Sequence, residues 1–281
     1  MKIARINQSK ELLIKGELIE SNIDRTRLHA NGNIETFEYI EGSIAGIKNN
    51  NLLGLELIEL AQLEMPFSPA DISNCILWSD AETLTGDNNS SVTVLEDLVG
   101  GNNFITNGNT LLNTDGIKSI KCSNGSLTTQ NNIGVNINSA RTIIVLAKPY
   151  SNGNLFGYGI QSASEMLDAL LYGLVCGIHA FGGGYDNLSI APSFSLNVTQ
   201  AFTILYDGVK VKTGVNRNFS LEKDMALYTA NTPFKIGAGI FNSYNTWSGE
   251  IMEVIIFDRA LNNEELNTLY DYLGSKRGLT L

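Results

Sequence analysis

The chain of 281 residues is 43% hydrophobic and only 17% charged, and its formal net charge at pH 7 is −10. This composition supports a sizeable folded core, and the negative charge argues against nucleic acid and anionic membrane surfaces, which bind clustered Lys and Arg. A neutral glycan or another protein stays compatible with it.

Residues 1–66 are predicted to form a small β-rich domain for attachment or oligomerisation. Asn31-Gly32 lies between two strand-like flanks, and this pair of residues is the usual centre of a type I′ hairpin turn. The apolar residues at the start of the run 52–64 alternate as they do in a strand, and a helical turn is an equal alternative for its second half. Because a single hairpin is marginal in isolation, we expect this domain to bind a partner or copies of itself.

Residues 67–71 are predicted to be a linker, because the prolines of "MPFSPAD" remove hydrogen-bond donors and stiffen the backbone. From residue 72 onward, short apolar runs alternate with turns rich in Asn and Gly. Asp207-Gly208, between "FTILY" and "VKVKT", has the signature of a hairpin. Closely spaced strands without interleaved helices predict an all-β, antiparallel two-sheet sandwich over 72–281.

The C-terminal stretch predicts one central strand and one short amphipathic helix. Residues 251–258 are the most apolar run of the chain, and Asn262 or Asn263 is placed to cap a helix. The two glutamates that follow suit the positive end of the helix dipole. Gly274 is predicted to end the helix in the left-handed conformation. The apolar positions that share one helix face are Leu266, Leu269, Tyr270 and Leu273.

The ending "GEIMEVIIFDRALNNEELNTLYDYLGSKRG" resembles the ending of concanavalin-A-like, laminin-G-like domains, which close with a strand, a polar cap and a helix. The opening "LWSDAETLTGDNNSSVTVLEDLVGGNN" is similar to the start of that family, and "RTIIVLAKP" is the middle anchor. The resemblance covers about residues 72–279 and implies a jelly-roll sandwich with a short C-terminal helix. Domains of this family bind glycans or proteins, so the resemblance identifies a fold more closely than a function.

The organisation of the whole chain is similar to that of bacteriophage virion proteins, such as head fibres, capsid decoration proteins and tail appendages. In those proteins a small N-terminal module attaches to the particle and a lectin-like module faces outward. The resemblance implies a non-enzymatic virion structural protein that displays its jelly roll to host or mucosal glycans. The alternative is a bacterial carbohydrate-binding protein or a glycan-active enzyme of the same fold.

The same resemblance implies the partners and the location of the chain. Other virion proteins are expected to bind residues 1–66, and a homo-oligomer is expected, with a trimer favoured. No apolar stretch has the length of a signal peptide or a membrane span, as expected for a virion protein made in the host cytoplasm.

The paired carboxylates of a glycosidase are not indicated. In enzymes of this fold the two alternate along one strand, which places both on one face. Glu250 and Glu253 are the nearest candidates, but their odd spacing in an extended strand predicts opposite faces.

His29 is interpreted as a solvated hairpin residue, and His179 as a core or loop residue rather than a base. The cysteines, which form no CxxC pair and are interpreted as buried thiols, are Cys75, Cys122 and Cys176.

Two loops combine aromatic rings with amide and carboxylate groups, the mixture that a glycan site needs. For "FGGGYDN" the alternative is a plain loop or bulge between strands, and for Trp247 it is a buried position beside the central strand. The predicted ligand-binding residues are Tyr185, Asp186 and Asn187 in the first loop and Asn242, Tyr244, Asn245 and Trp247 in the second.

No cofactor is predicted. Calcium is common in the resembled family, and Asp80, Asp87 and Asp97 lie in predicted loops. Their spacing does not single them out as ligands, so a calcium site is left unassigned.

Overall fold

The chain divides into two compact units, Met1–Phe67 and Ser68–Leu281. The computed structural model describes residues 67–281 except 136, 163–164, 180–191 and 241–246, and it describes the backbone of six strands within residues 1–66.

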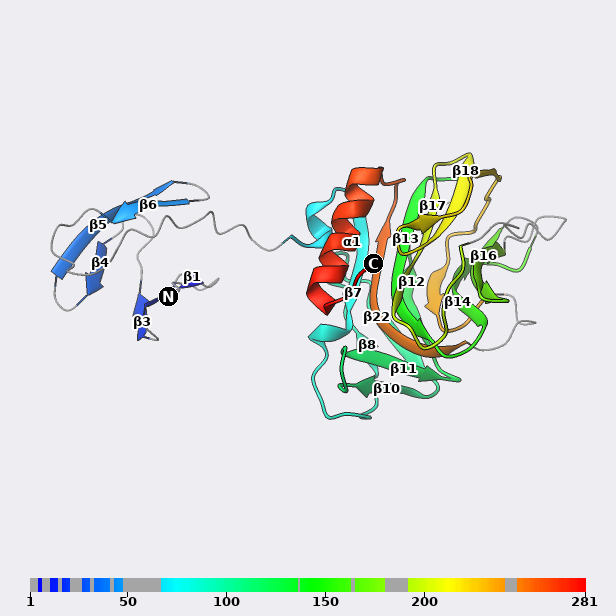
Figure 1. Ribbon diagram of the computed structural model, residues 1–281, viewed down its shortest axis with the longest axis horizontal. Helices are drawn as coiled ribbons and strands as arrows, with labels where there is room; N and C mark the ends of the chain where they lie inside the picture. The colour runs from blue at the N-terminus through cyan, green and yellow to red at the C-terminus, as the bar shows by residue number, and fades with distance from the viewer. Residues whose placement is uncertain are drawn as a thin grey trace. The chain divides into compact units, whose positions relative to one another are not determined.

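The strands described in the first unit form two antiparallel three-stranded sheets (Figure 1). The strands predicted on either side of Asn31-Gly32 are observed as β4 and β5, with Ala30 opposite Asn33. The run at 52–64 lies outside the described residues. The first sheet contains β1 (Arg5–Ile6), β2 (Glu11–Ile14) and β3 (Glu17–Glu20), and the second contains β4 (Arg27–Ala30), β5 (Asn33–Ile40) and β6 (Ser43–Ile47).

The second unit begins with a short 3-10 helix, η1 (Pro69–Asp71). The backbone N–H and the hydroxyl of Ser68 donate to the Asp71 carboxylate at 2.7 and 3.2 Å, and Pro69 is buried. Proline suits the first turn of a helix, where its fixed φ fits and its missing N–H has no helical partner. Residues 68–71, which the sequence assigned to a linker, thus belong to the second unit.

The larger sheet of the second unit has nine antiparallel strands. Its order is β10-β11-β22-β13-β17-β18-β19, with β7 also paired to β22 and β20 to β18. The most apolar predicted strand is β22, and it lies inside the sheet between β11 and β13. Asp207-Gly208 joins β17 and β18, as predicted, with Tyr206 opposite Val211. The strands are β7 (Cys75–Asp80), β10 (Thr110–Asn113), β11 (Ser119–Ser123), β13 (Arg141–Pro149), β17 (Gln200–Tyr206), β18 (Lys210–Val215), β19 (Asn218–Phe219), β20 (Lys223–Asp224) and β22 (Ser248–Phe257).

The smaller sheet has seven antiparallel strands in the order β16-β15-β14-β21-β12-β9-β8. A second 3-10 helix, η2 (Ala81–Thr83), follows β7 of the larger sheet. The strands are β8 (Val94–Leu95), β9 (Phe104–Asn107), β12 (Ser126–Asn132), β14 (Gly153–Gly159), β15 (Met166–Tyr172), β16 (Val175–His179) and β21 (Pro233–Ile236).

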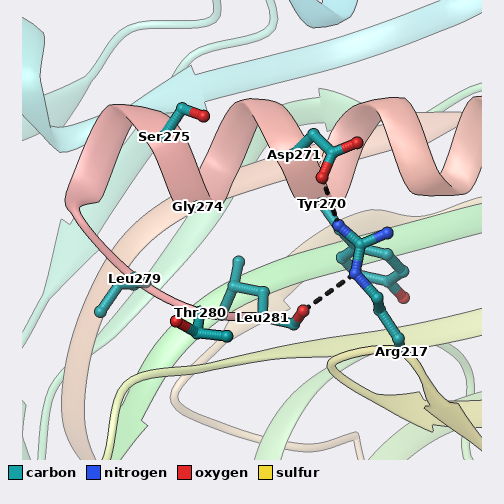
Figure 2. A pocket seen from close by; sticks show the side chains of 8 residues that line it. All are labelled: Arg217, Tyr270, Asp271, Gly274, Ser275, Leu279, Thr280 and Leu281. Carbon is teal, nitrogen blue, oxygen red and sulfur yellow. Dashed lines mark hydrogen bonds and ion pairs between the residues drawn. The ribbon is translucent and has the colours of Figure 1, made fainter.

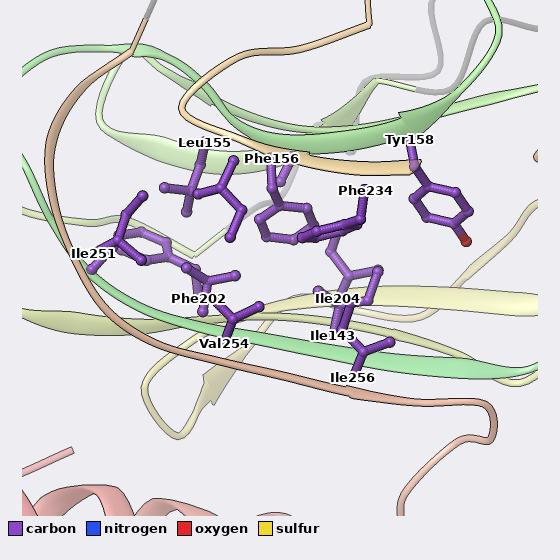
Figure 3. Close-up of a cluster of buried hydrophobic side chains, with 14 of the residues drawn as sticks. Ile143, Leu155, Phe156, Tyr158, Phe202, Ile204, Phe234, Ile251, Val254 and Ile256 are labelled. Carbon is purple, nitrogen blue, oxygen red and sulfur yellow. The ribbon is translucent and has the colours of Figure 1, made fainter. Parts of the chain in front are cut away.

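The two sheets pack face to face over one hydrophobic core (Figure 3). The smaller sheet contributes an aromatic cluster, in which the Phe234 ring lies 5.3 Å from Phe156 and 6.0 Å from Tyr158, measured between ring centroids. The larger sheet contributes aliphatic side chains such as Ile204 and Val254. The predicted antiparallel jelly-roll sandwich is confirmed.

One helix, α1 (Asn263–Arg277), covers the larger sheet on the side away from the core (Figure 1). Asn262 caps it, and Glu265 reaches back to the Asn262 N–H, so both orphan donors are satisfied. The predicted apolar face is confirmed, because Leu266, Leu269, Tyr270 and Leu273 are all buried. In the part of the chain that is described, no helix is long and apolar enough to cross a membrane.

The predicted end of this helix at Gly274 is wrong. The helix continues to Arg277, and Gly278 takes the left-handed conformation with φ of 65°. Gly274 serves a different purpose, because its carbonyl accepts the Leu279 N–H at 2.9 Å and a Cβ there would lie 2.8 Å from the Leu279 carbonyl oxygen. The returning chain packs too closely for any larger residue at this position.

Candidate functional site

The residues of the seven-stranded sheet that can carry charge near neutral pH all lie in one row across its strands. Those residues are Asp168, His179 and Lys235, as the strands are described. His179 of β16 lies opposite Asp168 of β15, which lies opposite Gly157 of β14. Gly157 lies opposite Lys235 of β21, which lies opposite Thr128 of β12. We call these five positions the charged row.

The charged row lies on the outer face of the sheet, away from the core. Leu167 and Ala169, on either side of Asp168, belong to the core, as do Phe234 and Ile236 on either side of Lys235. Because side chains alternate along a strand, Asp168 and Lys235 point outward.

Asp168 is fully buried although it lies on the outer face. Its Oδ1 accepts the backbone N–H of Ile240 at 2.9 Å. The same oxygen leans over Gly157, where a Cβ would lie only 1.8 Å from it. Glycine is therefore required at 157 by the carboxylate that lies across it.

Asn154 is a second fully buried polar residue on this face, opposite Leu170 and one strand away from Asp168. Neither its amide nitrogen nor its carbonyl oxygen has a hydrogen-bond partner. Gly239 packs directly on it, since a Cβ at 239 would lie 1.8 Å from Nδ2. A buried amide without partners costs roughly 1–3 kcal/mol, so its presence asks for a functional explanation.

The other end of the row is more open. Lys235 and Thr128 are half-buried, and Ile105, which lies opposite Thr128 on β9, is 39% exposed. Lys235 makes no hydrogen bond or ion pair with any described residue. The charged row is therefore buried at Asp168 and partly accessible at the Lys235 amine and the Thr128 hydroxyl.

The two segments predicted to bind ligand begin next to Asp168, at the buried end of the charged row. Residues 180–191 follow His179, which pairs with Asp168, and residues 241–246 follow Ile240, whose N–H bonds to Asp168. The sheet register therefore brings the starts of these two distant segments to one place. Six predicted ligand residues lie outside the described residues: Tyr185, Asp186, Asn187, Asn242, Tyr244 and Asn245.

Trp247 is described, and its side chain is fully buried in the core. Its ring packs across Gly249, where a Cβ would lie 2.4 Å from Cζ2. The buried interpretation of Trp247 is the one observed, and an exposed sugar platform at this position is excluded. Its indole Nε1 has no hydrogen-bond partner.

The prediction that Glu250 and Glu253 lie on opposite faces of their strand is wrong. A β-bulge at Met252 shifts the register, so that Glu250 lies opposite Lys148 and Glu253 opposite Leu146. These partners are two residues apart on β13, so both glutamates share the outer face of the nine-stranded sheet.

Both glutamates are buried and hydrogen-bonded within the fold. Glu250 accepts from Ser119 Oγ at 3.0 Å and from the Tyr150 hydroxyl. Glu253 accepts from Trp78 Nε1 at 2.8 Å and from the Tyr272 hydroxyl at 3.0 Å. Both carboxylates are therefore buried acceptors whose hydrogen-bond donors come from the fold itself.

Glu253 belongs to an ionic cluster that ties the last turn of α1 to the nine-stranded sheet. Arg277 and Lys276 each lie 3.3 Å from Glu253 Oε2. Burial first, and the Asp80 carboxylate second, raise the pKa of Glu253 above its ordinary value. We define the ionic cluster as Asp80, Glu82, Glu253, Lys276 and Arg277, in which Asp80 pairs with both cations and Glu82 with Arg277.

The carboxylates considered for calcium do not assemble into a site. Asp97 accepts four backbone N–H groups, from Trp78, Val99, Gly100 and Asn102, at 2.9–3.1 Å. Asp80 is in the ionic cluster, and Asp87 is exposed. Among the described residues, no three His, Cys, Asp or Glu side chains lie close enough together to hold a metal ion.

None of the three cysteines has the lowered pKa of a catalytic thiol, and the side chains of the two histidines are not among those described. Burial raises the pKa of Cys122 and of Cys176 to about 12, so both stay protonated, and the half-buried Cys75 shows the same rise. His29 lies on β4 and His179 on β16.

A hollow of about 270 Å³ lies between α1 and the last residues of the sequence (Figure 2). Arg217 crosses it, donating to Asp271 at 2.6 Å and to the Leu281 carbonyl at 2.9 Å. These polar groups satisfy one another, so we interpret the hollow as the boundary along which the C-terminal residues pack on the helix. A smaller hollow of about 130 Å³ lies beside Leu84 and Ser91.

Sequence reasoning did not single out Asn154, Asp168 or Lys235. One signal was present, because Asp168 interrupts the apolar strand "MLDALLY", and a carboxylate is rarely buried without a partner or a task. For Asn154 and Lys235 no local signal exists, since their roles depend on the register of β14, β15 and β21.

No protein-family model matches the chain, and no curated protein matches it. Solved structures do resemble it. Domain 4 of AbnA, a GH43 extracellular arabinanase from Geobacillus stearothermophilus, solved with arabinotriose, has a TM-score of 0.58 at 13% identity, over 70% of this chain and 98% of that one.

Two further structures are similar over part of their own length. The binding domain of botulinum neurotoxin serotype D has a TM-score of 0.51 at 15% identity, covering 70% of this chain and 50% of that chain. Trypanosoma rangeli sialidase has a TM-score of 0.50 at 11% identity, covering 75% and 34%. The chain therefore spans half of the toxin domain and a third of the sialidase. At such identities these likenesses establish the β-sandwich fold and no more.

Proposed function

We propose that the second unit is a non-catalytic glycan-binding module whose ligand lies on the outer face of the seven-stranded sheet, along the charged row. The observation that carries this is the set of unsatisfied polar groups on that face. Asn154 has two amide atoms without partners, and Lys235 has no partner among the described residues. On the opposite sheet the buried charges are paired with one another.

The chemistry of these groups matches a sugar. Asn154 both donates and accepts, Lys235 donates, and the Thr128 hydroxyl does either. Sugar hydroxyl groups act as donors and acceptors at once, so they satisfy such a mixture without bringing charge. Ile105 and Val94, exposed at the open end of the face, offer apolar contact for the carbon skeleton of a ring.

The names of the similar structures support this proposal. The arabinanase domain was solved with a bound oligosaccharide, the toxin domain is named for binding, and the sialidase acts on a sugar. They share with this chain the sandwich on which such a site is built.

The experiment is a glycan-array screen with the full chain, followed by calorimetry on the best ligand. Lys235→Ala is expected to weaken binding by about tenfold or more, as the loss of a charged hydrogen bond does. Lys121→Ala is the matched control, because Lys121 is also half-buried, on the outer face of the other sheet opposite Glu250, and also lacks a described partner. Chromatography of the bound glycan should show no cleavage. A chain that binds no glycan, or one that loses binding equally in both variants, contradicts the proposal.

We also propose the finer role in which this module is displayed on a bacteriophage particle, anchored through residues 1–66. The organisation of the sequence supports it, together with the division into a small and a large unit. Short strands in so small a unit favour pairing with a partner or with copies of itself, a trimer by analogy with fibres.

Sedimentation of the full chain and of a chain starting at Ser68 tests this role. The full chain is expected to be oligomeric or to join capsid or tail components on mixing, while the shorter chain stays monomeric. A monodisperse full-length monomer that joins none of them would leave the bacterial glycan-binding alternative ahead.

A further inference from the structure

The register of the seven-stranded sheet continues the charged row from its accessible end to the last strand of the sheet. Lys235 on β21 lies opposite Thr128 on β12, and Thr128 lies opposite Ile105 on β9. Ile105 in turn lies opposite Val94 on β8, the last strand in the order of this sheet as it is described. We call these four residues the open row.

The open row lies on the outer face of the sheet. Leu127, Phe104 and Leu95, which are chain neighbours of its three outer members, belong to the core. Because side chains alternate along a strand, the members of the row point away from the core. Ile105 is 39% exposed and Val94 is 37% exposed, so the row is accessible up to the edge of the sheet.

The segment 237–240 covers the face on the other side of the open row. It follows β21 directly and lies over β14 and β15, the next two strands of the sheet. Gly239 packs on Asn154 of β14, since a Cβ at 239 would lie 1.8 Å from Nδ2, and the Ile240 N–H donates to Asp168 of β15 at 2.9 Å. Asn154 and Asp168 are fully buried, so the open row is closed at one end only.

We propose that the open row binds the end of a linear glycan chain, with the terminal sugar at Lys235 and Thr128 and the following units over Ile105 and Val94. The proposal rests on the glycan-binding function above and names its ligand class. A glycan lying along the row meets the segment 237–240 at one end and leaves the sheet at the other. Three strand spacings separate the first and last members of the row, roughly 14 Å, which is enough for a few sugar units.

The polar and apolar members of the row are divided in the same direction. Lys235 makes no hydrogen bond or ion pair with any described residue, so its amine is available to donate, and the Thr128 hydroxyl both donates and accepts. Ile105 and Val94 offer only apolar contact. Hydrogen bonds therefore recognise the hydroxyl groups of the terminal sugar, while the later units contribute affinity with little selectivity.

The test measures how binding depends on the length of the ligand. The probes are arabino-oligosaccharides and malto-oligosaccharides of one to five units, together with linear arabinan and amylose of several lengths, each titrated into the full chain. Affinity is expected to rise until the row is filled, at about three units, and then to stay constant. The number of protein molecules bound to each polysaccharide chain should not change as that chain becomes longer.

Two variants locate the terminal sugar on the row. Lys235→Ala should weaken every oligomer by the same factor of about tenfold, because each places a terminal unit there. Ile105→Thr keeps a β-branched side chain but removes apolar contact, so it should weaken trimers and longer oligomers by about threefold and leave the single sugar unchanged. Val209→Thr is the matched control, because Val209 is an exposed aliphatic residue that follows β17 of the other sheet, and it should alter no affinity.

Three results would overturn the chain-end proposal while leaving glycan binding in place. One is a number of bound proteins that grows with polysaccharide length, and another is an affinity that still rises between four and five units. The third is a failure of all these probes to bind when the glycan array yields another ligand. An array without any ligand would instead reject the proposed function, and this inference with it.

Discussion

The outer faces of the two sheets both bury polar groups, and the most deeply buried carboxylate of one face differs from the most deeply buried amide of the other in its partners. On the nine-stranded sheet, the buried Glu253 has an indole, a phenol and two cations around it. On the seven-stranded sheet, Asn154 is as deeply buried but its two amide atoms have no partner, and Lys235 has none among the described residues.

The difference separates polar groups whose partners come from the fold itself from polar groups that have no described partner. Burying a charge is tolerable when partners surround it, which is how the ionic cluster fastens α1 to its sheet. A buried amide without partners weakens the fold, so its retention favours a role in recognition. Under the proposed function, one face serves stability and the other face serves binding, and a separate variant can test each of these roles.

The largest expected effect is on the nine-stranded face. Arg277→Met leaves Asp80 and Glu253 buried with one cation fewer, and the loss of one partner from a buried pair costs about 3–5 kcal/mol. Urea denaturation should show this loss in the free energy of unfolding, while the glycan affinity of the folded fraction stays unchanged.

Arg217→Ala is the control for that variant. Arg217 pairs with Asp271 of the same helix, but its side chain is 39% exposed and Asp271 is 74% exposed. Exposed pairs contribute about 0–1 kcal/mol, so this change should be mild. Equal losses of unfolding free energy in the two variants would mean that the ionic cluster is not what holds the helix on its sheet.

The next effect concerns the glycine beneath Asp168. Gly157→Ala places a methyl group 1.8 Å from the present position of Asp168 Oδ1, so the carboxylate must move. Overpacking of this kind costs about 1–3 kcal/mol, and the displaced charge should also alter glycan affinity. Gly177→Ala on β16 is the matched control, since its nearest neighbour there would be 4.0 Å away, and it should change neither quantity appreciably.

The fold was predictable where the signal is local. Helix α1 follows from its apolar face and from Asn262, and both hairpins from Asn-Gly and Asp-Gly, because these features depend only on neighbouring residues. The sequence placed the end of α1 at Gly274, which is wrong. Arg277 stays in the helix because it pairs with Asp80, which is far away in the sequence.

The candidate site was predictable in part. The loops that follow His179 and Ile240 were selected from their composition, and the structure brings the starts of both to Asp168. The bulge that turns Glu253 to the same side as Glu250 leaves no mark in the sequence, because it is set by pairing with β13. Asn154 was not predicted for a related reason, because the sequence does not show which hydrogen-bond partners an asparagine in a strand will have.

A smaller effect, of opposite sign, is expected at Asn154. Asn154→Leu replaces two unpartnered amide atoms with a side chain of similar shape, so the free energy of unfolding should rise by about 1 kcal/mol. Glycan affinity should fall in the same variant, a combination that a merely structural residue does not produce.

Asn113 provides the matched comparison, because it is equally buried but donates to Ser119 Oγ at 3.1 Å. Asn113→Leu should destabilise the fold by about 1–3 kcal/mol and leave binding unchanged. Destabilisation by both variants would show that Asn154 is satisfied within the fold, and the contrast between the two faces would disappear.

The smallest effect is the dependence of stability on pH, where two glutamates should act in opposite directions. The pKa of Glu253 is raised, chiefly by burial, so its contribution to stability is full below the ordinary value of 4.5 and is lost as the pH rises through the raised pKa. The pKa of Glu265 is lowered, chiefly by its hydrogen bond from Arg259, so its contribution is present above 4.5 and is lost as the pH falls through the lowered pKa.

Glu253→Gln and Glu265→Gln separate the two contributions, because each removes one titration while keeping a similar shape. Urea denaturation from below to above pH 4.5 should show that Glu253→Gln lacks the decline in stability that the natural chain has on the alkaline side of 4.5. Glu265→Gln should lack the decline on the acidic side, which is worth at most about 1 kcal/mol because the Arg259–Glu265 pair is partly exposed to solvent. Parallel profiles for both variants would mean that neither environment shifts its glutamate in the folded state.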